Sequence, residues 1–359
     1  MISLRLYLRY YGCIMQKPVT MKDIANRLSV SSVTVSKALG GKEGVSEEVR
    51  NQIIQVAKEM GYRKNLIAKD MRDGTTHNVG VLIGERHMQR DCAYMRIQQE
   101  LNKHLLNQGY YGIVELITNE DEETGKIPRL LCDNKVDALV LLGQLRPSYV
   151  KTILAFGFPY VFVDFFYENY QADAVISDNM YGGYSLTNHL LALGHRMISF
   201  VGNPMYSNVV MDRYLGYYKA LMEQGIAPDQ ALVLHDCDEL GQRIELALPK
   251  KSPTAYVCAS CETAYRLMQQ LQGQGLQIPD QVSIVGFDED LYTTLSNPPL
   301  TTFSVDIPLM ALSAAESIIN KIANPDSHFG RKTICGSLTV RQSSARITPA
   351  EWDSLNRFG

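Results

Sequence analysis

The feature of the sequence that most constrains the fold is an alternation of short apolar runs with longer amphipathic stretches from residue 79 onward. Short apolar runs are typical of buried strands, and longer amphipathic stretches are typical of helices. The runs that we expect to be strands are Val79–Ile83, Gly112–Ile117, Ala138–Leu142, Val161–Asp164, Ile198–Val201, Ala231–Leu234, Ala255–Cys258 and Val282–Phe287. This alternation predicts parallel βαβ units with helices on both faces of the sheet.

The stretches between these runs supply the helices of that arrangement. Those expected to be helical include Tyr94–Gln108, Gly182–Ala192, Arg213–Gln224 and Glu262–Gln274. Eight strands would overfill one typical sheet. We therefore predict an α/β body of two similar lobes, each with a doubly wound parallel sheet. A chain of 359 residues is long enough for two or three domains.

The composition is that of a globular protein, with 45% hydrophobic and 20% charged residues. The seven cysteines are scattered and odd in number, which favours a reducing compartment over a disulfide framework. Near the start, Arg5 and Arg9 interrupt the apolar Leu4, Leu6 and Leu8, so no signal peptide is expected. No later run approaches the roughly 20 apolar residues of a membrane span. We expect a cytoplasmic protein without a membrane partner.

Charge is distributed unevenly along the chain. Residues 16–76 carry eleven Lys or Arg and seven Asp or Glu, whereas residues 77–359 carry a net charge of −9. A basic head on an acidic body is expected when only the head meets phosphate.

The first two helices of the head are separated by a tight turn. Thr20 and Asp23 form a capping-box pattern for a helix over 21–28. Ser31 caps a second helix, which ends at Gly40-Gly41. A third helix begins at Ser46 and ends before Gly61.

The outward face of the second helix distinguishes a DNA reader from a plain helical bundle. With Val35 and Leu39 facing inward, the residues left outside are Ser32, Val33, Ser36 and Lys37. Short polar side chains beside one Lys suit close approach to base edges and phosphates in a major groove. We therefore expect double-stranded DNA as a partner.

The segment VTMKDIANRLSVSSVTVSKALGGKEGVSEEVRNQIIQVAKEMGY resembles the helix-turn-helix head of the lactose-repressor (LacI/GalR) family. The family patterns T-x-x-D-I/V-A, V-S-x-x-T-V-S and G-V-S-x-x-x-R occur in this order and spacing. By that resemblance Ser32, Val33 and Lys37 read bases, while Thr34, Ser36 and Tyr62 contact phosphates. Thr20 and Ser31 complete the DNA-binding set expected for the head.

The stretch RKNLIAKDMRDG after Tyr62 resembles the hinge helix of the same family, with Asn65 and Ala68 at matching positions. Met71 stands where the family usually has Leu. The resemblance implies that, in a homodimer, the Met71 side chains of the two hinges wedge into a minor-groove step and bend the operator. A Met side chain is apolar and flexible enough for that role.

The resemblance extends through the body. ISDNMYGGYSLTNHLLALGHR, DRYLGYYKAL and IPDQVSIVGFDED match further family blocks. It implies a periplasmic-binding-protein-like fold that binds a small-molecule effector between its lobes, with Arg213 and Asp288 as effector contacts. Arg offers a planar fork of donors and Asp accepts hydrogen bonds from hydroxyls, so together they suit a carbohydrate. Tyr94 and Asp164 are further candidates, because Tyr94 can stack on a sugar ring and Asp164 ends an apolar strand.

Two departures put a common pentose or hexose contact set in doubt. The family often has Asn-Asp where this chain has Ser260-Cys261, and Asn-Pro-Phe-Phe where it has DCAY at 91–94. A purine or another metabolite is the alternative effector. A solute-binding protein is the alternative function, against which the head and the missing signal peptide argue.

Enzyme and metal chemistry find no support. The sequence contains neither G-x-G-x-x-G nor a P-loop nor G-x-S-x-G. Cys258 and Cys261 lack the further ligands of a closed zinc site, and the seven histidines, among them His87, show no ligand spacing. We expect no enzyme activity, no catalytic or metal-binding residues and no cofactor.

These patterns predict the following domains. Residues 1–17 form a disordered extension, because Met15 opens the better-patterned segment. The head covers 18–63 and the hinge 64–76. The effector-binding and dimerisation body covers 77–349, with the first lobe formed by 77–175 plus 305–333 and the second by 176–304 plus 334–349.

Overall fold

The computed structural model describes residues 19–62, 74–90, 92–170, 172–250 and 252–347. The chain divides into two compact units, and the division follows Gly74. This boundary falls inside the range predicted for the hinge. The predicted extension 1–17 and most of the predicted hinge lie outside the described residues.

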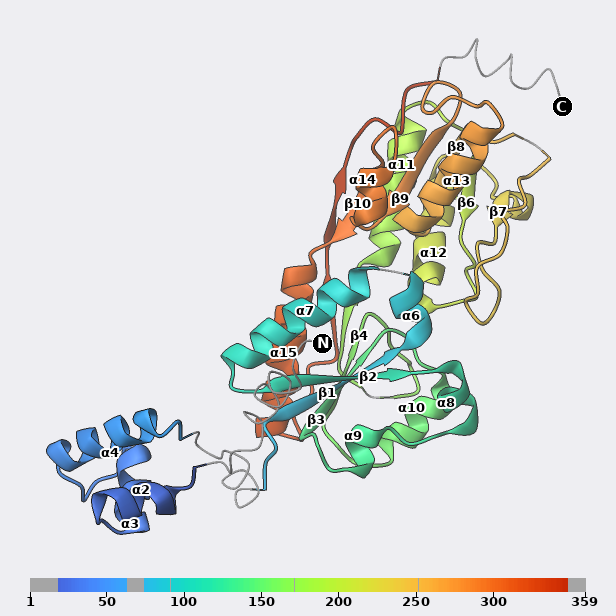
Figure 1. Ribbon diagram of the computed structural model, residues 1–359. Coiled ribbons are helices and arrows are strands. Elements are labelled where there is room, and N and C mark those ends of the chain that lie inside the picture. Colours follow the sequence, from blue (N-terminus) through green and yellow to red (C-terminus); the bar gives the residue numbers. More distant parts are fainter. Residues whose placement is uncertain (1–18, 63–73, 91, 171, 251, 348–359) are drawn as a thin grey trace, which may run out of the picture. The chain divides into compact units, whose positions relative to one another are not determined.

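The head consists of α2 (Met21–Leu28), α3 (Ser32–Leu39) and α4 (Glu47–Glu59) (Figure 1). The three predicted N-caps are confirmed, since the side chains of Thr20, Ser31 and Ser46 each accept a backbone N–H from the first turn. Ser29 ends α2 in the left-handed region at φ 54°. The head has its own core, made of Ile24, Ala25, Val35, Ala38, Ile53 and Ala57.

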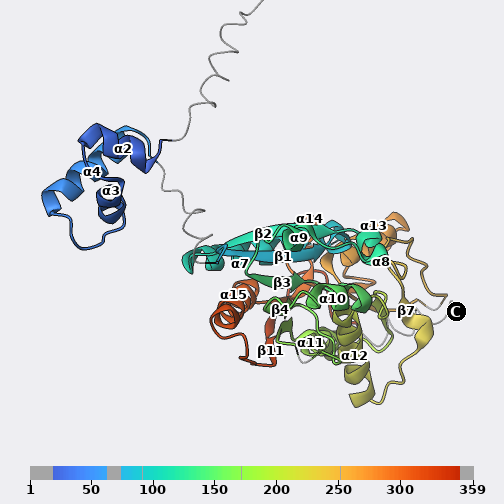
Figure 2. The ribbon, with the colours of Figure 1, turned by 90° about the horizontal axis from the view of Figure 1, so that it is seen from below.

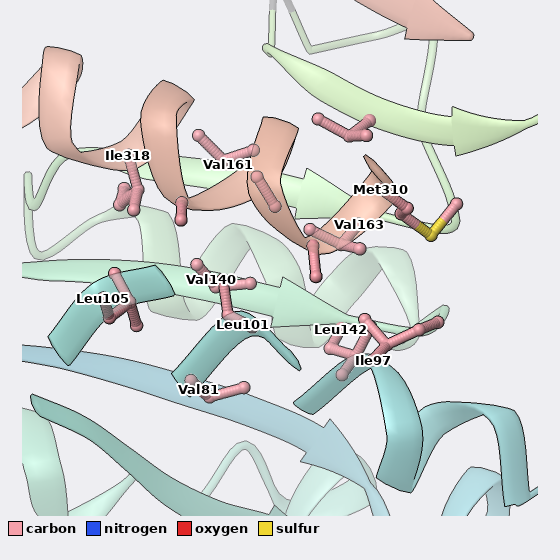
Figure 3. Packing of buried hydrophobic residues seen from close by; sticks show 14 of the residues in the cluster. Val81, Ile97, Leu101, Leu105, Val140, Leu142, Val161, Val163, Met310 and Ile318 are labelled. Atoms are coloured by element: carbon pink, nitrogen blue, oxygen red, sulfur yellow. The ribbon is translucent and has the colours of Figure 1, made fainter. Parts of the chain in front are cut away.

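The first lobe of the body is built on a parallel sheet with strand order β11-β5-β4-β3-β1-β2. Its strands are β1 (Asn78–Gly84), β2 (Tyr111–Ile117), β3 (Ala138–Leu142), β4 (Tyr160–Val163), β5 (Ala174–Ser177) and β11 (Arg331–Ile334). Helices α7 (Cys92–Asn107) and α15 (Ile307–Ala323) cover one face (Figure 3). The other face carries α9 (Arg129–Cys132) and α10 (Pro147–Leu154), next to α8 (Asn119–Thr124) (Figure 2).

The second lobe has the strand order β12-β10-β9-β8-β6-β7. Its strands are β6 (Ile198–Val201), β7 (Val233–Leu234), β8 (Ala255–Cys258), β9 (Ser283–Phe287), β10 (Thr301–Val305) and β12 (Gly336–Thr339). Helices α11 (Asn179–Ala192) and α12 (Asn208–Glu223) pack on one face and α13 (Cys261–Gly273) on the other. The short α6 (Glu85–Arg90) and α14 (Leu291–Leu295) follow β1 and β9. This is the expected two-lobed α/β body.

The strand predictions need three corrections. The run predicted as Ala231–Leu234 begins with a 3-10 turn over Gln230–Leu232, and only Val233–Leu234 is strand. Strands β5, β10, β11 and β12 were not predicted, because short or polar sequences such as RKTI and GSLT contain no apolar run. The second sheet is also not wholly parallel, since β12 pairs antiparallel with β10.

The chain crosses between the lobes close to the predicted positions. Strands β5 and β11 of the first sheet end at Ser177 and Ile334. The chain therefore leaves the first lobe after these residues, slightly later than the predicted 175 and 333. The remaining crossing lies between β10 and α15. Three segments of the chain therefore connect the lobes.

Helices α11 and α12 touch through their backbones. A Cβ atom on Gly183 would lie 2.0 Å from the carbonyl oxygen of Arg213, and one on Gly216 would lie 2.0 Å from that of Met180. Both glycines belong to the family blocks quoted above. They are required because any side chain would push the two helices apart.

We expect Gly216→Ala to destabilise the body by roughly 1–3 kcal/mol or more, because the added methyl group overpacks a backbone contact. Gly273→Ala is the matched control, since a Cβ there meets nothing within 4 Å at the end of α13. Thermal unfolding of the two variants checks this. Equal midpoints for both variants would contradict the required close approach.

Candidate functional site

The exposed face of α3 is the first candidate site. Ser32, Val33, Ser36 and Lys37 are all exposed, as the sequence predicted, and Val33 is 65% exposed. An exposed apolar side chain among short polar ones provides a contact for a thymine methyl group beside hydrogen-bond donors.

The structure gives other predicted DNA contacts a local role as well. Ser31 Oγ accepts the backbone N–H of Thr34 at 3.0 Å, and the two hydroxyls lie 2.8 Å apart. Thr20 and Asp23 form the full capping box of α2. Tyr62 packs against the head core, and burial raises the pKa of its hydroxyl. The predicted contacts Asn65, Ala68 and Met71 lie outside the described residues.

Arg50 of α4 fixes the end of α3, a role that was not predicted. Its guanidinium donates to the carbonyl oxygens of Ala38 at 3.1 Å and Lys42 at 2.7 Å. Ala38 lies in the last turn of α3, where carbonyls lack partners further along the helix, and Lys42 lies in the turn that follows. The signal was present, because Arg50 is the Arg of the pattern G-V-S-x-x-x-R.

The second candidate site is a cavity between the two lobes that opens to solvent and holds about 490 Å³ of space, open solvent included. It is lined by His87, Tyr94, Tyr206, Ser207, Val209, Val210, Arg213, Asp236, Ala259 and Ser260. The residues that follow β1, β6, β7 and β8 contribute to it, so it lies beyond the carboxyl ends of strands from both sheets. This is the usual place for ligands in parallel α/β proteins. We call it the first cavity.

Arg213 is buried in the wall of the first cavity, and its guanidinium is held in place. Its Nε donates to Asn179 Oδ1 at 2.8 Å, and its Nη1 donates to the carbonyl oxygen of Ala259 at 2.5 Å. Nη1 also lies 3.1 Å from Asp288 Oδ2, and the guanidinium stacks over the ring of Phe287 at 4.1 Å. Arg213 and Asp288 therefore meet in the second lobe, as the motifs implied.

Tyr94 and Asp164 meet in the first lobe. The Tyr94 hydroxyl donates to Asp164 Oδ2 at 2.9 Å, and Ser177 Oγ donates to Asp164 Oδ1 at 2.9 Å. Tyr94 lines the cavity, whereas Asp164 and Asp288 support lining residues from behind. Asp164 and Asp288 follow β4 and β9, and both adopt the left-handed region at φ 63° and 71°. Asp tolerates this region better than most residues.

Sequence reasoning missed several lining residues, among them His87, Tyr206 and Asp236. The spacing of His87 in the sequence indicated no ligand role, but its ring lies 5.0 Å from that of Tyr94 at the cavity. Asp236 accepts the Asn203 backbone N–H at 3.1 Å and the Thr263 hydroxyl at 2.7 Å. Each follows a strand or lies in the helix after one, and this position was the available signal.

Cys258 ends β8 and Cys261 begins α13, and both are buried. Burial raises the pKa of the Cys258 thiol, which keeps it protonated. Within the described ranges, no group of His, Cys, Asp and Glu is arranged to hold a metal ion. Among the same residues, no helix is both long and apolar enough to cross a membrane.

Comparison with known proteins defines the class. Residues 20–65 match the family of bacterial regulatory proteins named lacI, and residues 187–344 match a periplasmic binding protein-like domain. The protein is therefore a regulatory protein with a helix-turn-helix head and a ligand-binding type of body. It belongs to the lacI family.

Two curated relatives and one solved structure show the extent of the similarity. The ribose operon repressor of Haemophilus influenzae is 27% identical over 90% of this chain and 98% of that protein. The HTH-type transcriptional repressor PurR of Vibrio atlanticus is 26% identical over 86% of this chain and 93% of that protein. The lac repressor dimer bound to operator and the anti-inducer ONPF has the same fold, with a TM-score of 0.78 at 22% identity, covering 92% of this chain and all of that one.

The buried Asp164 makes the stability of the body depend on pH. Burial raises the pKa of its carboxyl group, with Arg213 opposing that shift. The folded state therefore favours the protonated form, and it loses stability as the pH rises from about 4, the ordinary Asp value, through the folded pKa. At neutral pH the charged carboxylate destabilises the fold.

We expect Asp164→Asn to raise the unfolding midpoint at pH 7 by about 2–4 °C, equivalent to roughly 1 kcal/mol in a domain of this size. The amide lacks the charge and tolerates the positive φ. The difference from the natural protein should shrink toward pH 4. The exposed Asp326→Asn serves as control. A lower midpoint for Asp164→Asn at pH 7 would show that the carboxylate stabilises the cleft.

Proposed function

We propose that the protein is a transcriptional repressor that binds operator DNA as a homodimer. Its affinity for the operator changes when a small molecule occupies the first cavity. The observation that carries this proposal is the combination, in one chain, of the exposed polar face of α3 with a cavity lined by Arg213, which Asp288 holds from behind. Relatives named as repressors support it.

The DNA-binding residues we propose are those of the head and hinge named above. Ser32, Val33 and Lys37 would meet base edges, while Thr20, Ser31, Thr34, Ser36 and Tyr62 would position the head on phosphates. Asn65, Ala68 and Met71 would act at the centre of the operator. One three-helix head buries too little surface for tight specific binding, so two heads are needed.

Exposed apolar residues of the body support the proposed homodimer. Edge strand β2 exposes Tyr111, Val114 and Leu116, and α14 exposes Leu291 and Leu295. Helix α7 packs beside β2, and its Arg96 donates to the carbonyl oxygen of Glu289 at 2.5 Å, just before α14. Exposed apolar residues therefore occur in both lobes. Such residues are candidates for the contact between two copies of the chain.

A carbohydrate is the effector class that fits the first cavity best. Arg213, held by Asp288 behind it, supplies donors on one side, and the rings of Tyr94 and Tyr206 supply flat surfaces. Tyr94, backed by Asp164, would close on the ligand from the first lobe. A purine is the second candidate, because the same two rings suit a flat base.

We expect Lys37→Ala to lower the affinity for the selected operator about tenfold, or ~1.4 kcal/mol. The operator is first selected from random DNA with the full-length protein. The slope of log affinity against log salt should become shallower by about 0.9 for each phosphate that the variant no longer neutralises. Lys58→Ala on α4 is the control. Failure to enrich any DNA sequence would overturn the proposed function.

We expect Asp288→Asn to weaken or abolish the effector response while leaving effector-free operator affinity unchanged. The amide removes the charged partner that holds Arg213 in the cavity wall. Effectors are first found by thermal shift with sugars, sugar phosphates and purines, and the operator is then titrated with and without the compound. An undiminished response in the variant would remove Asp288 from the sensing machinery.

A further inference from the structure

A second cavity adjoins the first, and Tyr206 lines both. It holds about 430 Å³ of space, open solvent included. Arg86, Asn119, Gln144 and Tyr167 form its wall in the first lobe, and Glu239 and Leu240 in the second. It therefore lies in the same interlobe cleft. Neither the sequence motifs nor the contacts of Arg213 account for it.

The wall of the second cavity is polar, and its two guanidinium groups are paired with carboxylates. The Arg86 guanidinium donates to Asn119 Oδ1 at 3.1 Å and to the Gln144 carbonyl oxygen at 2.7 Å, and it pairs with the buried Glu122. Arg146, at the same wall, pairs with Glu123 at 2.9 Å. Because both guanidinium charges are balanced, the cavity favours a neutral molecule with hydroxyl groups over an anion.

Tyr167, which also lines this cavity, is uncharged. Its hydroxyl donates to the Leu145 carbonyl oxygen at 2.5 Å, and burial raises the pKa of Tyr167 to about 12. The wall therefore offers oriented hydrogen-bonding groups at neutral pH. Such groups recognise a ligand by the positions of its hydroxyls.

Two rings lie near the point where the cavities adjoin: Tyr206 lines both cavities, and its ring lies 6.1 Å from that of His87, which lines the first. His87 is held by the Gln144 carbonyl oxygen at 2.8 Å and fits against Gly143, where a Cβ would lie 2.9 Å from the ring. Tyr206 lies on Gly241, where a Cβ would lie 2.5 Å from its ring. Both rings therefore occupy fitted positions, and each comes from a different lobe.

A tight loop of the second lobe covers the second cavity. Asp238 Oδ1 accepts the backbone N–H groups of Leu240 at 2.9 Å and Gln242 at 2.8 Å. The base of the loop is closed by the bridge between Cys237 and Arg243. Leu240 at its tip is 43% exposed and lines the cavity. The loop is preorganised, so residues at its tip can select the ligand.

We propose that the effector occupies both cavities, and that it is a neutral, hydroxyl-rich molecule of two linked rings, such as a disaccharide. One ring would lie with Arg213 and Tyr94, and the other under the Asp238–Gln242 loop beside Asn119. The linkage would pass beside the Tyr206 ring, which lines both cavities. This inference rests on the proposed function and specifies its ligand class.

The test is isothermal titration calorimetry of the full-length protein with cellobiose, maltose and lactose against glucose, galactose and ribose. Glucose 6-phosphate and hypoxanthine complete the panel. One disaccharide should bind at least tenfold more tightly than either of its constituent sugars. Equal or tighter binding of a single-ring compound, or no binding of any disaccharide, overturns the inference.

Variants of the loop tip then locate the second ring. Leu240→Trp should fill the second cavity and lower the disaccharide affinity at least tenfold, and Glu239→Trp, which fills it from the neighbouring position, should act likewise. Leu309→Trp, at a site of matched 44% exposure on α15, should change the affinity less than twofold. Unchanged disaccharide affinity in folded loop variants overturns the inference.

Failure of this inference is distinguishable from failure of the proposed function. If a monosaccharide, glucose 6-phosphate or hypoxanthine binds and changes the affinity for the selected operator, the repressor function stands and the two-ring ligand is wrong. If no DNA sequence is enriched by the protein, the proposed function itself fails.

Discussion

The backbone contact between α11 and α12 is the constraint on which the effector site depends. Gly183 and Gly216 let the two helices approach so closely that Asn179 at the start of α11 reaches Arg213 on α12. The same approach places the guanidinium over Phe287 and beside Asp288. A buried arginine is costly unless each of its donors is paired, and this packing supplies the partners. The charge at the cleft is thus fixed by the fold of the second lobe.

Each lobe presents its functional groups by the same device. A buried parallel strand ends, the chain turns, and a polar or aromatic residue faces the cleft. Asp164 after β4 and Asp288 after β9 even share the left-handed backbone conformation. Because three segments of the chain connect the lobes, a ligand that contacts both lobes would bias their relative placement. A ligand can shift such an equilibrium only by its different affinity for the two states.

The sequence predicts much of this architecture because its main signals are local. Apolar runs located the strands buried on both faces, and Thr20, Ser31 and Ser46 located the helix starts in the head. Polar strands such as β11 and β12 could not be predicted, because only pairing with a neighbour makes them strands. The family motifs identified Arg213 and Asp288. His87, Tyr206 and Asp236 carried no motif, and they become neighbours only when the carboxyl ends of two sheets face each other.

The most direct test of the account is thermodynamic reciprocity between operator and effector. The affinity for the selected operator is measured with and without saturating effector, and the affinity for the effector with and without saturating operator. Linked sites must show the same factor in both directions, typically 5- to 150-fold. The account predicts equal factors different from one. An effector that binds the first cavity with the same affinity in the presence and absence of operator would contradict it.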